Sequence, residues 1–341
     1  MSERSFSRFL PLLAVLAALL PMQSARADAS RNAALRYWRG LALLSPELEE
    51  AIKAVDFDDL IGDPDWSPNG TTREALESSD AQSVIHEFLK AGALPECDFG
   101  ADPEDGIELL LPHLGGLRTG AKLLLLDGRT KLVDGDSQAA SARFAAVYEL
   151  AAHTAEDNFL VNSLVSVSIT TMCGNVLMHD SVLHRLGAQG RKTVGLATWR
   201  FEEQDPFHLQ RAIASDGDLM TVWLRDRFAA PVTEAQLKAM MEEWFDSTEG
   251  TEALLAIVND TEALDAALVR MQLWYTQTAA DWNKPDAMER LEKMKTEFRS
   301  TTREHPYGLL TELFVPGVTL AKKNELRGID SLDRARAMLA N

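Results

Sequence analysis

The sequence predicts an all-α protein with two helical lobes, and three observations lead to that prediction. Apolar residues recur at helical spacing along most of the 341-residue chain. Runs of alternating apolar and polar residues bounded by turn residues, which are typical of strands, are absent from the sequence. Proline, glycine and capping residues divide the chain at intervals that suit helices. The content of 46% hydrophobic and 25% charged residues is typical of a packed globular protein.

The first 27 residues have the three parts of a secretory signal peptide. Two early arginines supply a basic start, residues 9–20 carry no charge, and Ala25-Arg26-Ala27 places small residues at a cleavage site. The apolar stretch is about a dozen residues long, whereas a helix needs about 20 to span a bilayer. We therefore expect cleavage after Ala27, with Ala29 as the alternative, and a periplasmic or secreted protein.

In the expected first lobe, residues 28–190, capping residues, prolines and glycines bound each helix. Ser30 caps the first helix and Pro46 ends it. The glycines at 115, 116 and 120 each weaken a helix by about 1 kcal/mol relative to alanine, so we expect a neighbouring helix to approach closely there. The predicted helices are 30–45, Pro46–Val55, Ser79–Gly92, Leu109–Val133, Ser137–His153 and Phe159–Met178, with acidic loops at Asp56–Gly70 and Pro95–Gly106.

The last of these helices raises the question of a membrane span. Residues 159–178 include no charged residue, but seven are Ser, Thr or Asn. That polar content favours a helix buried on most sides in a soluble bundle. We expect it to be the central helix of the first lobe, and no transmembrane segment in the mature chain.

The predicted linker is Gly187–Val194, and the composition changes after it, since five of the seven tryptophans lie at 199 or later. The second lobe, residues 191–341, is expected to hold helices at Pro206–Phe228, Thr233–Phe245, Thr251–Trp282, Pro285–Arg303 and Thr319–Leu339. Its aromatic residues would line a groove for a peptide or carbohydrate, or would pack in the core, and their helical spacing favours the core. One helix face is too narrow to bury all of Trp274, Tyr275 and Trp282; the other two residues of this set are Trp223 and Trp244.

One part of the first lobe resembles a tetratricopeptide repeat. Gly135-Asp136-Ser137, followed by Ala140, Phe144 and Val147, is similar to the second helix of such a repeat, and Gly128 stands where the first helix carries a small residue. The resemblance covers about thirty residues, and no second copy follows at a 34-residue period. It therefore implies one helical hairpin and no repeat array.

A broader resemblance rests on three short segments. Asn32-Ala33-Ala34-Leu35-Arg36-Tyr37-Trp38, Cys97-Asp98-Phe99-Gly100 and Leu111-Pro112-His113-Leu114 are similar to segments of a group of secreted bacterial helical proteins. That group has no assigned activity. The resemblance implies the fold and export, and it transfers no catalytic residue.

Glu149, His153 and Asp157 are the main candidates for chemistry. Together with Glu156 they recur at helical spacing, so one helix face would present them as metal ligands or as an acid–base pair. The alternative is a solvated helix end with a Glu–His contact four residues apart, and we favour it because such pairs are common on exposed faces. Sequence signatures of a nucleophilic serine or a phosphate-binding loop are absent.

The first acidic loop has oxygen ligands at the spacing of a calcium-binding loop. Asp63, Asp65 and Glu74 stand at positions 1, 3 and 12 of that pattern. Pro68 occupies the position that needs glycine, so we expect a looser calcium site or a solvated loop. Asp98, Asp102, Glu104 and Asp105 form the second such loop.

Cys97 and Cys173 have two alternatives of equal weight. In an oxidising compartment they would form a disulfide that stabilises the fold by about 4 kcal/mol, because it closes a long loop. Otherwise they are two buried thiols. Sequence alone does not determine the distance between them.

Charge and motifs together favour a binding protein. The 34 basic and 52 acidic side chains give a formal charge of −18, or −20 after removal of residues 1–27, and such a surface repels a nucleic-acid backbone. We expect a non-catalytic binding or scaffold module of the cell envelope with a protein or peptide partner and no resident cofactor other than calcium. The alternative is an all-α hydrolase or metal-dependent enzyme that uses Glu149, His153 and Asp157.

Overall fold

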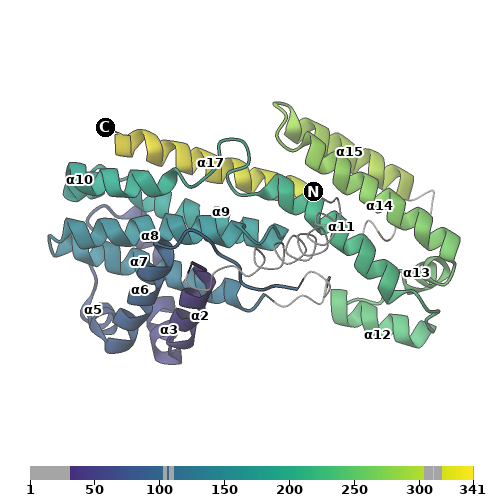
Figure 1. Ribbon diagram of the computed structural model, residues 1–341, viewed down its shortest axis with the longest axis horizontal. Helices are drawn as coiled ribbons and strands as arrows, with labels where there is room; N and C mark the ends of the chain where they lie inside the picture. The colour runs from purple at the N-terminus through teal and green to yellow at the C-terminus, as the bar shows by residue number, and fades with distance from the viewer. Residues whose placement is uncertain (1–30, 103–105, 107–110, 303–309, 311–316, 341) are drawn as a thin grey trace, which may run out of the picture.

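The computed structural model describes residues 31–102, 106, 111–302, 310 and 317–340, which fold into helices (Figure 1). The expected signal peptide, residues 1–27, and its cleavage site lie outside the described residues. Within the described ranges, the β structure consists of an isolated parallel bridge between Asn32 and Glu96. The all-α prediction is confirmed.

Most helices end close to the predicted boundaries. Those before residue 200 are α2 (Ala34–Ala42), α3 (Pro46–Lys53), α4 (Phe57–Gly62), α5 (Gly70–Glu77), α6 (Ser79–Gly92), α7 (His113–Val133), α8 (Ser137–Ala155), α9 (Leu160–Leu177) and α10 (Asp180–Thr198). Those after it are α11 (Leu209–Arg227), α12 (Glu234–Phe245), α13 (Thr251–Val258), α14 (Thr261–Asp281), α15 (Ala287–Thr302) and α17 (Val318–Ala340).

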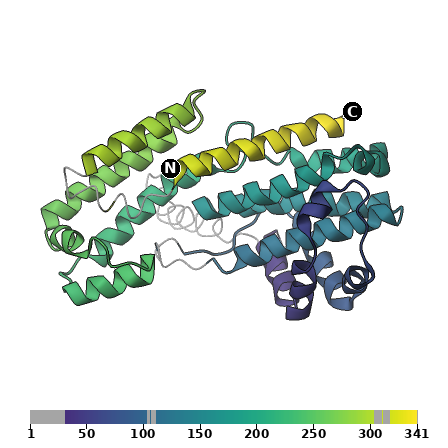
Figure 2. The ribbon, with the colours of Figure 1, turned by 180° about the vertical axis from the view of Figure 1, so that it is seen from behind.

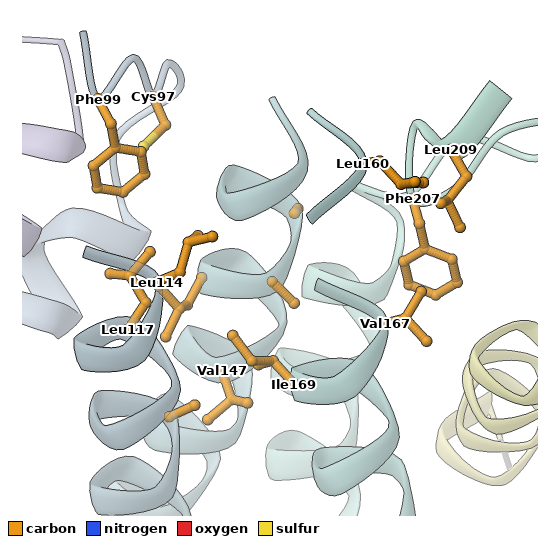
Figure 3. Packing of buried hydrophobic residues seen from close by; sticks show 14 of the residues in the cluster. Cys97, Phe99, Leu114, Leu117, Val147, Leu160, Val167, Ile169, Phe207 and Leu209 are labelled. Carbon is orange, nitrogen blue, oxygen red and sulfur yellow. The ribbon is translucent and has the colours of Figure 1, made fainter. Parts of the chain in front are cut away.

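Helix α8 lies at the centre of a layer of long helices. It packs against α7, α9 and α10, while α17 returns along α9 and α10 (Figure 1). The short helices α2 to α6 lie beside this layer near one end of the molecule (Figure 1). Helices α11 to α15 lie near the opposite end, as the reverse view in Figure 2 also shows. Figure 3 shows apolar side chains packed between neighbouring helices of this layer, with Leu117 of α7, Val147 of α8 and Ile169 of α9 all buried.

Helix α9 is the predicted buried helix. It is long and apolar enough to cross a membrane by length and composition, yet 61% of it is buried inside the protein. Ser163, Ser166 and Thr170 are fully buried, and Gly174 lies so close to Ser331 of α17 that an added Cβ would be 2.0 Å from its Oγ. Small residues on this face therefore let α17 approach, which confirms that this apolar helix is buried, although α8 is the helix at the centre of the layer.

Helices α7 and α8 form the predicted hairpin. Asp136 begins α8, because its carboxylate accepts a hydrogen bond of 2.9 Å from the backbone N–H of Ala139. A Cβ at Gly128 would lie 2.9 Å from the ring of Phe144, and one at Gly120 would lie 2.1 Å from the ring of Phe88. The close approach expected at the glycines of α7 is thus present at Gly120 and at Gly116, where a Cβ would lie 2.6 Å from Leu41, but it is absent at Gly115, where a Cβ would have no neighbour within 4 Å among the described residues.

The predicted linker is helical. Residues 187–194 belong to α10, which is interrupted at Gly187, where φ is 66°. Val194 and Ala197 are buried because α10 packs on α8 and α17. The residues whose composition predicted a linker are therefore part of a packed helix. The division at residue 190 into two lobes stays a prediction.

The five aromatic residues considered for a groove, Trp223, Trp244, Trp274, Tyr275 and Trp282, lie in the core or pack against it. Trp223, Trp274, Tyr275 and Trp282 are each at most 8% exposed, and Trp244 packs against Trp223 with ring centroids 5.1 Å apart. Trp274, Tyr275 and Trp282 are all buried although one helix face is too narrow for them, because α11, α13 and α15 pack around α14 on several faces. The expected helix 251–282 is two helices, since Asp260 caps α14 by accepting from two backbone N–H groups.

Candidate functional site

The end of α8 brings the main candidate residues into the protein interior. Glu149 and His153 lie on the last turns of α8, and Glu156 and Asp157 follow directly. His153 is fully buried, while the side chains of Glu149 and Asp157 are 20% and 7% exposed. The expectation of a solvated helix end is wrong, because residues 94–99 and the end of α10 cover this surface. We call these four residues, with His113 and Arg200, the α8-end cluster.

His153 is held by two hydrogen bonds within the fold. Its Nε2 lies 3.1 Å from the carbonyl oxygen of Leu94, which only accepts, so Nε2–H donates there. Its Nδ1 lies 3.0 Å from the hydroxyl of Tyr37 and accepts from it. Burial lowers the pKa of His153 to about 3, so the ring is neutral at physiological pH. Because both ring nitrogens are occupied, His153 is a structural residue.

Arg200 connects two of the acids to the loop that covers them. Its Nε lies 3.2 Å from Glu149 and its Nη2 lies 3.4 Å from Glu156. The guanidinium also donates to the carbonyl of Pro95 at 3.3 Å. Glu156 accepts a hydrogen bond of 2.7 Å from the backbone N–H of Cys97. Burial raises the pKa of Glu149 to about 7 and also raises that of Glu156.

Asp157 forms a separate group with His113. Its carboxylate accepts a hydrogen bond of 3.2 Å from Asn162, and the backbone N–H of Phe99 lies 3.5 Å away. Nε2 of His113 lies 4.0 Å from Asp157 Oδ2 and makes no hydrogen bond with the described residues. Burial raises the pKa of Asp157 to about 6 and lowers that of His113. The His113 ring stacks on Phe99 with centroids 4.2 Å apart.

The three segments that resemble secreted helical proteins meet at this cluster. Asn32 exchanges hydrogen bonds of 2.9 and 3.0 Å with the backbone of Asp98. The ring of Trp38 meets that of His113 edge to face at 5.5 Å, and Tyr37 stacks near Phe99 at 6.1 Å. Arg200 and His113 were missed as cluster members from sequence. For His113, the short segment that contains it was the sequence signal that pointed to this place.

The cluster suits proton exchange better than metal binding. Glu149 and Asp157 titrate near neutral pH, which is a property of acid–base catalysts and also of buried ion-pair networks. Among the described residues, no group of three or more His, Cys, Asp and Glu side chains is arranged to hold a metal ion. The expected convergence of Glu149, His153 and Asp157 on one ligand is absent, since each bonds to a different part of the chain.

The first acidic loop is organised by a buried arginine. Arg129, which is 2% exposed, donates to the carbonyl oxygens of Leu60 at 3.3 Å and Asp63 at 2.8 Å. Asp65 is mostly exposed and its carboxylate lies 3.6 Å from Arg185, while Glu74 is exposed on α5. The guanidinium thus places a positive charge beside the backbone of the loop in which a calcium ion would have to bind. A calcium site at Asp63, Asp65 and Glu74 stays a prediction.

The second acidic loop is described only in part. Asp98 accepts a hydrogen bond of 2.8 Å from the backbone N–H of Gly100 and so shapes the turn. Glu104 and Asp105, predicted with Asp98 and Asp102 as oxygen ligands, lie outside the described residues.

The two cysteines are free thiols, and both are buried. The Cys173 thiol donates to the carbonyl oxygen of Phe144 at 3.7 Å. Burial raises the pKa of both thiols, so neither has the thiolate character of a reactive cysteine. Of the two alternatives from sequence, the structure has the buried thiols.

No protein-family model, curated protein or solved structure matches the chain. The functional argument therefore depends on the contacts described above and on the protein surface.

Proposed function

We propose that the protein is a non-catalytic binding module of the cell envelope, exported by the signal at residues 1–27, that holds a protein or peptide partner on its helical surface. One observation carries this proposal. Leu196 and Trp199, on one face of α10, are 63% and 71% exposed, although most large apolar side chains of the protein are buried. We call them the Leu196–Trp199 face.

The surroundings of this face suit a partner. A hollow of about 180 Å³ lies between it and the last turns of α17, where Arg336 and Leu339 contribute to the wall. The guanidinium of Arg336 lies 5.3 Å from the Trp199 ring and donates to the carbonyl of Thr198 at 2.7 Å. Tryptophan and arginine are enriched at the residues that dominate binding energy in interfaces. An indole held in place by a neighbouring cation also loses little freedom when it binds.

The partner's chemistry follows from the charges beside the face. Lys192 and Arg336 line this hollow and no acid does, in a protein with a formal charge of −18. We expect a peptide or helix that places an apolar side chain in the hollow and a carboxylate near Lys192.

A comparison of variants tests the proposal. The mature protein, immobilised, is exposed to the envelope fraction of its own cell. Leu196→Ala/Trp199→Ala should lose the partner that the wild type retains. The matched control is Val269→Ala/Leu273→Ala, which removes two side chains of α14 that are 57% and 63% exposed. Retention of the same partner by the first variant, or the absence of any partner of the wild type, would contradict the proposal.

One observation favours a second candidate, an acid–base enzyme at the α8-end cluster. The buried His113 Nε2 without a hydrogen bond lies 4.0 Å from a carboxyl group whose pKa is about 6. Metal analysis of the purified mature protein tests the metal-dependent form of this candidate. A stoichiometric transition metal that is lost in Asp157→Asn would favour a metal-dependent enzyme and would contradict the argument that the cluster is not arranged to hold a metal ion.

A further inference from the structure

A hollow of about 810 Å³ lies against one face of α17, and none of its lining residues belongs to the α8-end cluster or the Leu196–Trp199 face. Its walls come from the segment before α11, the start of α11, the turn between α14 and α15, and α17. We call it the α17 hollow. Its volume falls within the range of about 300–1,000 Å³ that is usual for small-ligand sites.

The walls of the α17 hollow are fixed by hydrogen bonds. Gln210 of α11 donates to the carbonyl of Ala279 at 2.9 Å and accepts from Asn283 at 2.7 Å. Beneath the surface, Glu325 accepts a hydrogen bond of 2.9 Å from the indole of Trp282 and pairs with Lys322. These contacts join α11, the end of α14 and α17, so the shape of the hollow is preformed.

The positive charges of the lining are already neutralised. Lys284 lies 2.6 Å from Asp281, and Lys322 pairs with the fully buried Glu325. One lining acid is also neutralised, since Asp286 lies 2.7 Å from Arg290. The lining therefore has no unpaired cation of its own.

Three lining residues carry side-chain hydrogen-bond acceptors that form no bond with the described residues. Glu203, Gln204 and Glu289 take part in no hydrogen bond or ion pair with the part of the chain that the structure describes. All three are exposed to solvent, so they stay hydrated in the free protein. Glu203 and Glu289 thus carry two carboxylates without an ion pair among the described residues, although the charge of Glu289 also contributes to the raised pKa of Arg290.

The remaining lining is apolar. Pro285 comes from the turn after α14, Met288 lies on the first turn of α15, and Leu326 and Ile329 lie on α17. Leu326 is 44% exposed, which is unusual for a leucine of this protein. A ligand that fits both parts of the lining has a cationic head and an aliphatic stem.

We propose that the α17 hollow binds an alkylammonium group, carried by a lysine side chain or a free polyamine, between Glu203, Gln204 and Glu289. An ammonium has three N–H donors, which match two carboxylates and one amide oxygen. Its methylene stem lies on Met288 and Leu326. The formal charge of −18 attracts such cations to the surface and speeds their encounter.

Calorimetric titration of the full mature chain tests this proposal with three probes. They are spermidine, a capped Ala-Lys-Ala peptide and the same peptide with the lysine Nε acetylated, which keeps the stem and removes the charge. Spermidine, the lysine peptide or both should bind, and the acetylated peptide should not. Whichever of the two cations binds more tightly identifies the source of the group.

The variant Glu203→Gln/Glu289→Gln should weaken binding about tenfold or more, since two charge-assisted hydrogen bonds are lost. The matched control is Glu242→Gln/Glu243→Gln, which removes two exposed charges on α12, outside the hollow, and should leave affinity within about twofold. Equal weakening by the two double variants would mean general attraction to an acidic surface and would overturn the proposal. So would the absence of binding by both cations at low salt.

Discussion

The α8-end cluster and the α17 hollow both contain acidic side chains, but these differ in burial and in whether they bond to other parts of the chain. In the cluster, Glu149, Glu156 and Asp157 are partly buried and each contacts an arginine or a donor of the chain. In the hollow, Glu203 and Glu289 are exposed and unpaired. We call acids that bond to other parts of the chain committed acids, and they should control stability. Acids without such bonds, which we call uncommitted acids, should control binding. Residue type and spacing alone do not separate these two groups.

The largest expected effect comes from the committed acid beneath the hollow. Glu325→Ala should lower the free energy of unfolding by about 3–5 kcal/mol, because it leaves the ammonium of Lys322 buried without a partner. The double variant Lys322→Met/Glu325→Leu should cost far less, since it removes both charges. Urea unfolding measures both changes.

The uncommitted acids supply the control for this prediction. Glu203→Gln/Glu289→Gln should change the free energy of unfolding by no more than about 0.5 kcal/mol, because exposed side chains without partners contribute little. If Glu325→Ala changed stability as little as this control, the distinction between committed and uncommitted acids would fail at its clearest example.

A second prediction concerns pH and the α8-end cluster. Burial raises the pKa of Glu149 in the folded protein to about 7, above its usual value of 4.5. The folded state therefore binds this proton more tightly than the unfolded state. The resulting stabilisation is fully present below about pH 4.5 and is lost as the pH rises through about 7.

The measurement is the free energy of unfolding at pH 5 and pH 8. Between these values it should fall by about 1–2 kcal/mol more in the wild type than in Glu149→Gln, which has no proton to lose. Glu243→Gln, a change at an exposed carboxylate of α12, should retain the wild-type pH dependence. A Glu149→Gln protein with the full pH dependence would show that Arg200 already stabilises the ionised carboxylate.

Local signals predicted the helices well and the cluster poorly, for a physical reason. Pro46, predicted as the start of a helix, acts within one turn, so the residues beside it are enough to locate α3; the turn at Gly135-Asp136 before α8 is equally local, and there the structure adds that Asp136 caps the helix. The helical spacing of Glu149, His153 and Asp157 predicted that they share one helix face. It did not show whether that face is exposed to solvent or covered by other parts of the protein. The answer depends on Tyr37 and Arg200, which lie far away in the sequence.

The break between α13 and α14 is a second feature that the spacing of apolar residues did not predict. Apolar residues continue through 251–282 at helical spacing, so the pattern predicted one helix. Asp260 instead accepts from the backbone N–H groups of Glu262 and Ala263, and a new helix starts there. Asn259 completes the break by bonding the backbone of Val232 at 2.8 Å. That partner is 27 residues away and no local pattern reveals it.

The smallest expected effect is that of calcium, and it concerns a third set of acids. Asp63, Asp65 and Glu74 match the spacing of a calcium loop, but Arg129 already holds the carbonyl of Asp63. Adding calcium should therefore raise the melting temperature by less than about 1 °C, which corresponds to a few tenths of a kcal/mol. Magnesium is the control for general screening of negative charge.

Arg129→Met separates the two roles of this loop. The variant removes the cation that Leu60 and Asp63 bind, and so should lower the melting temperature in the absence of calcium. If the freed carbonyl oxygens then join Asp65 and Glu74 around an ion, calcium should restore part of the loss in the variant while leaving the wild type unchanged. A rise of several degrees in the wild type itself would show that the loop binds calcium beside Arg129, and that exposed acids here act as ligands.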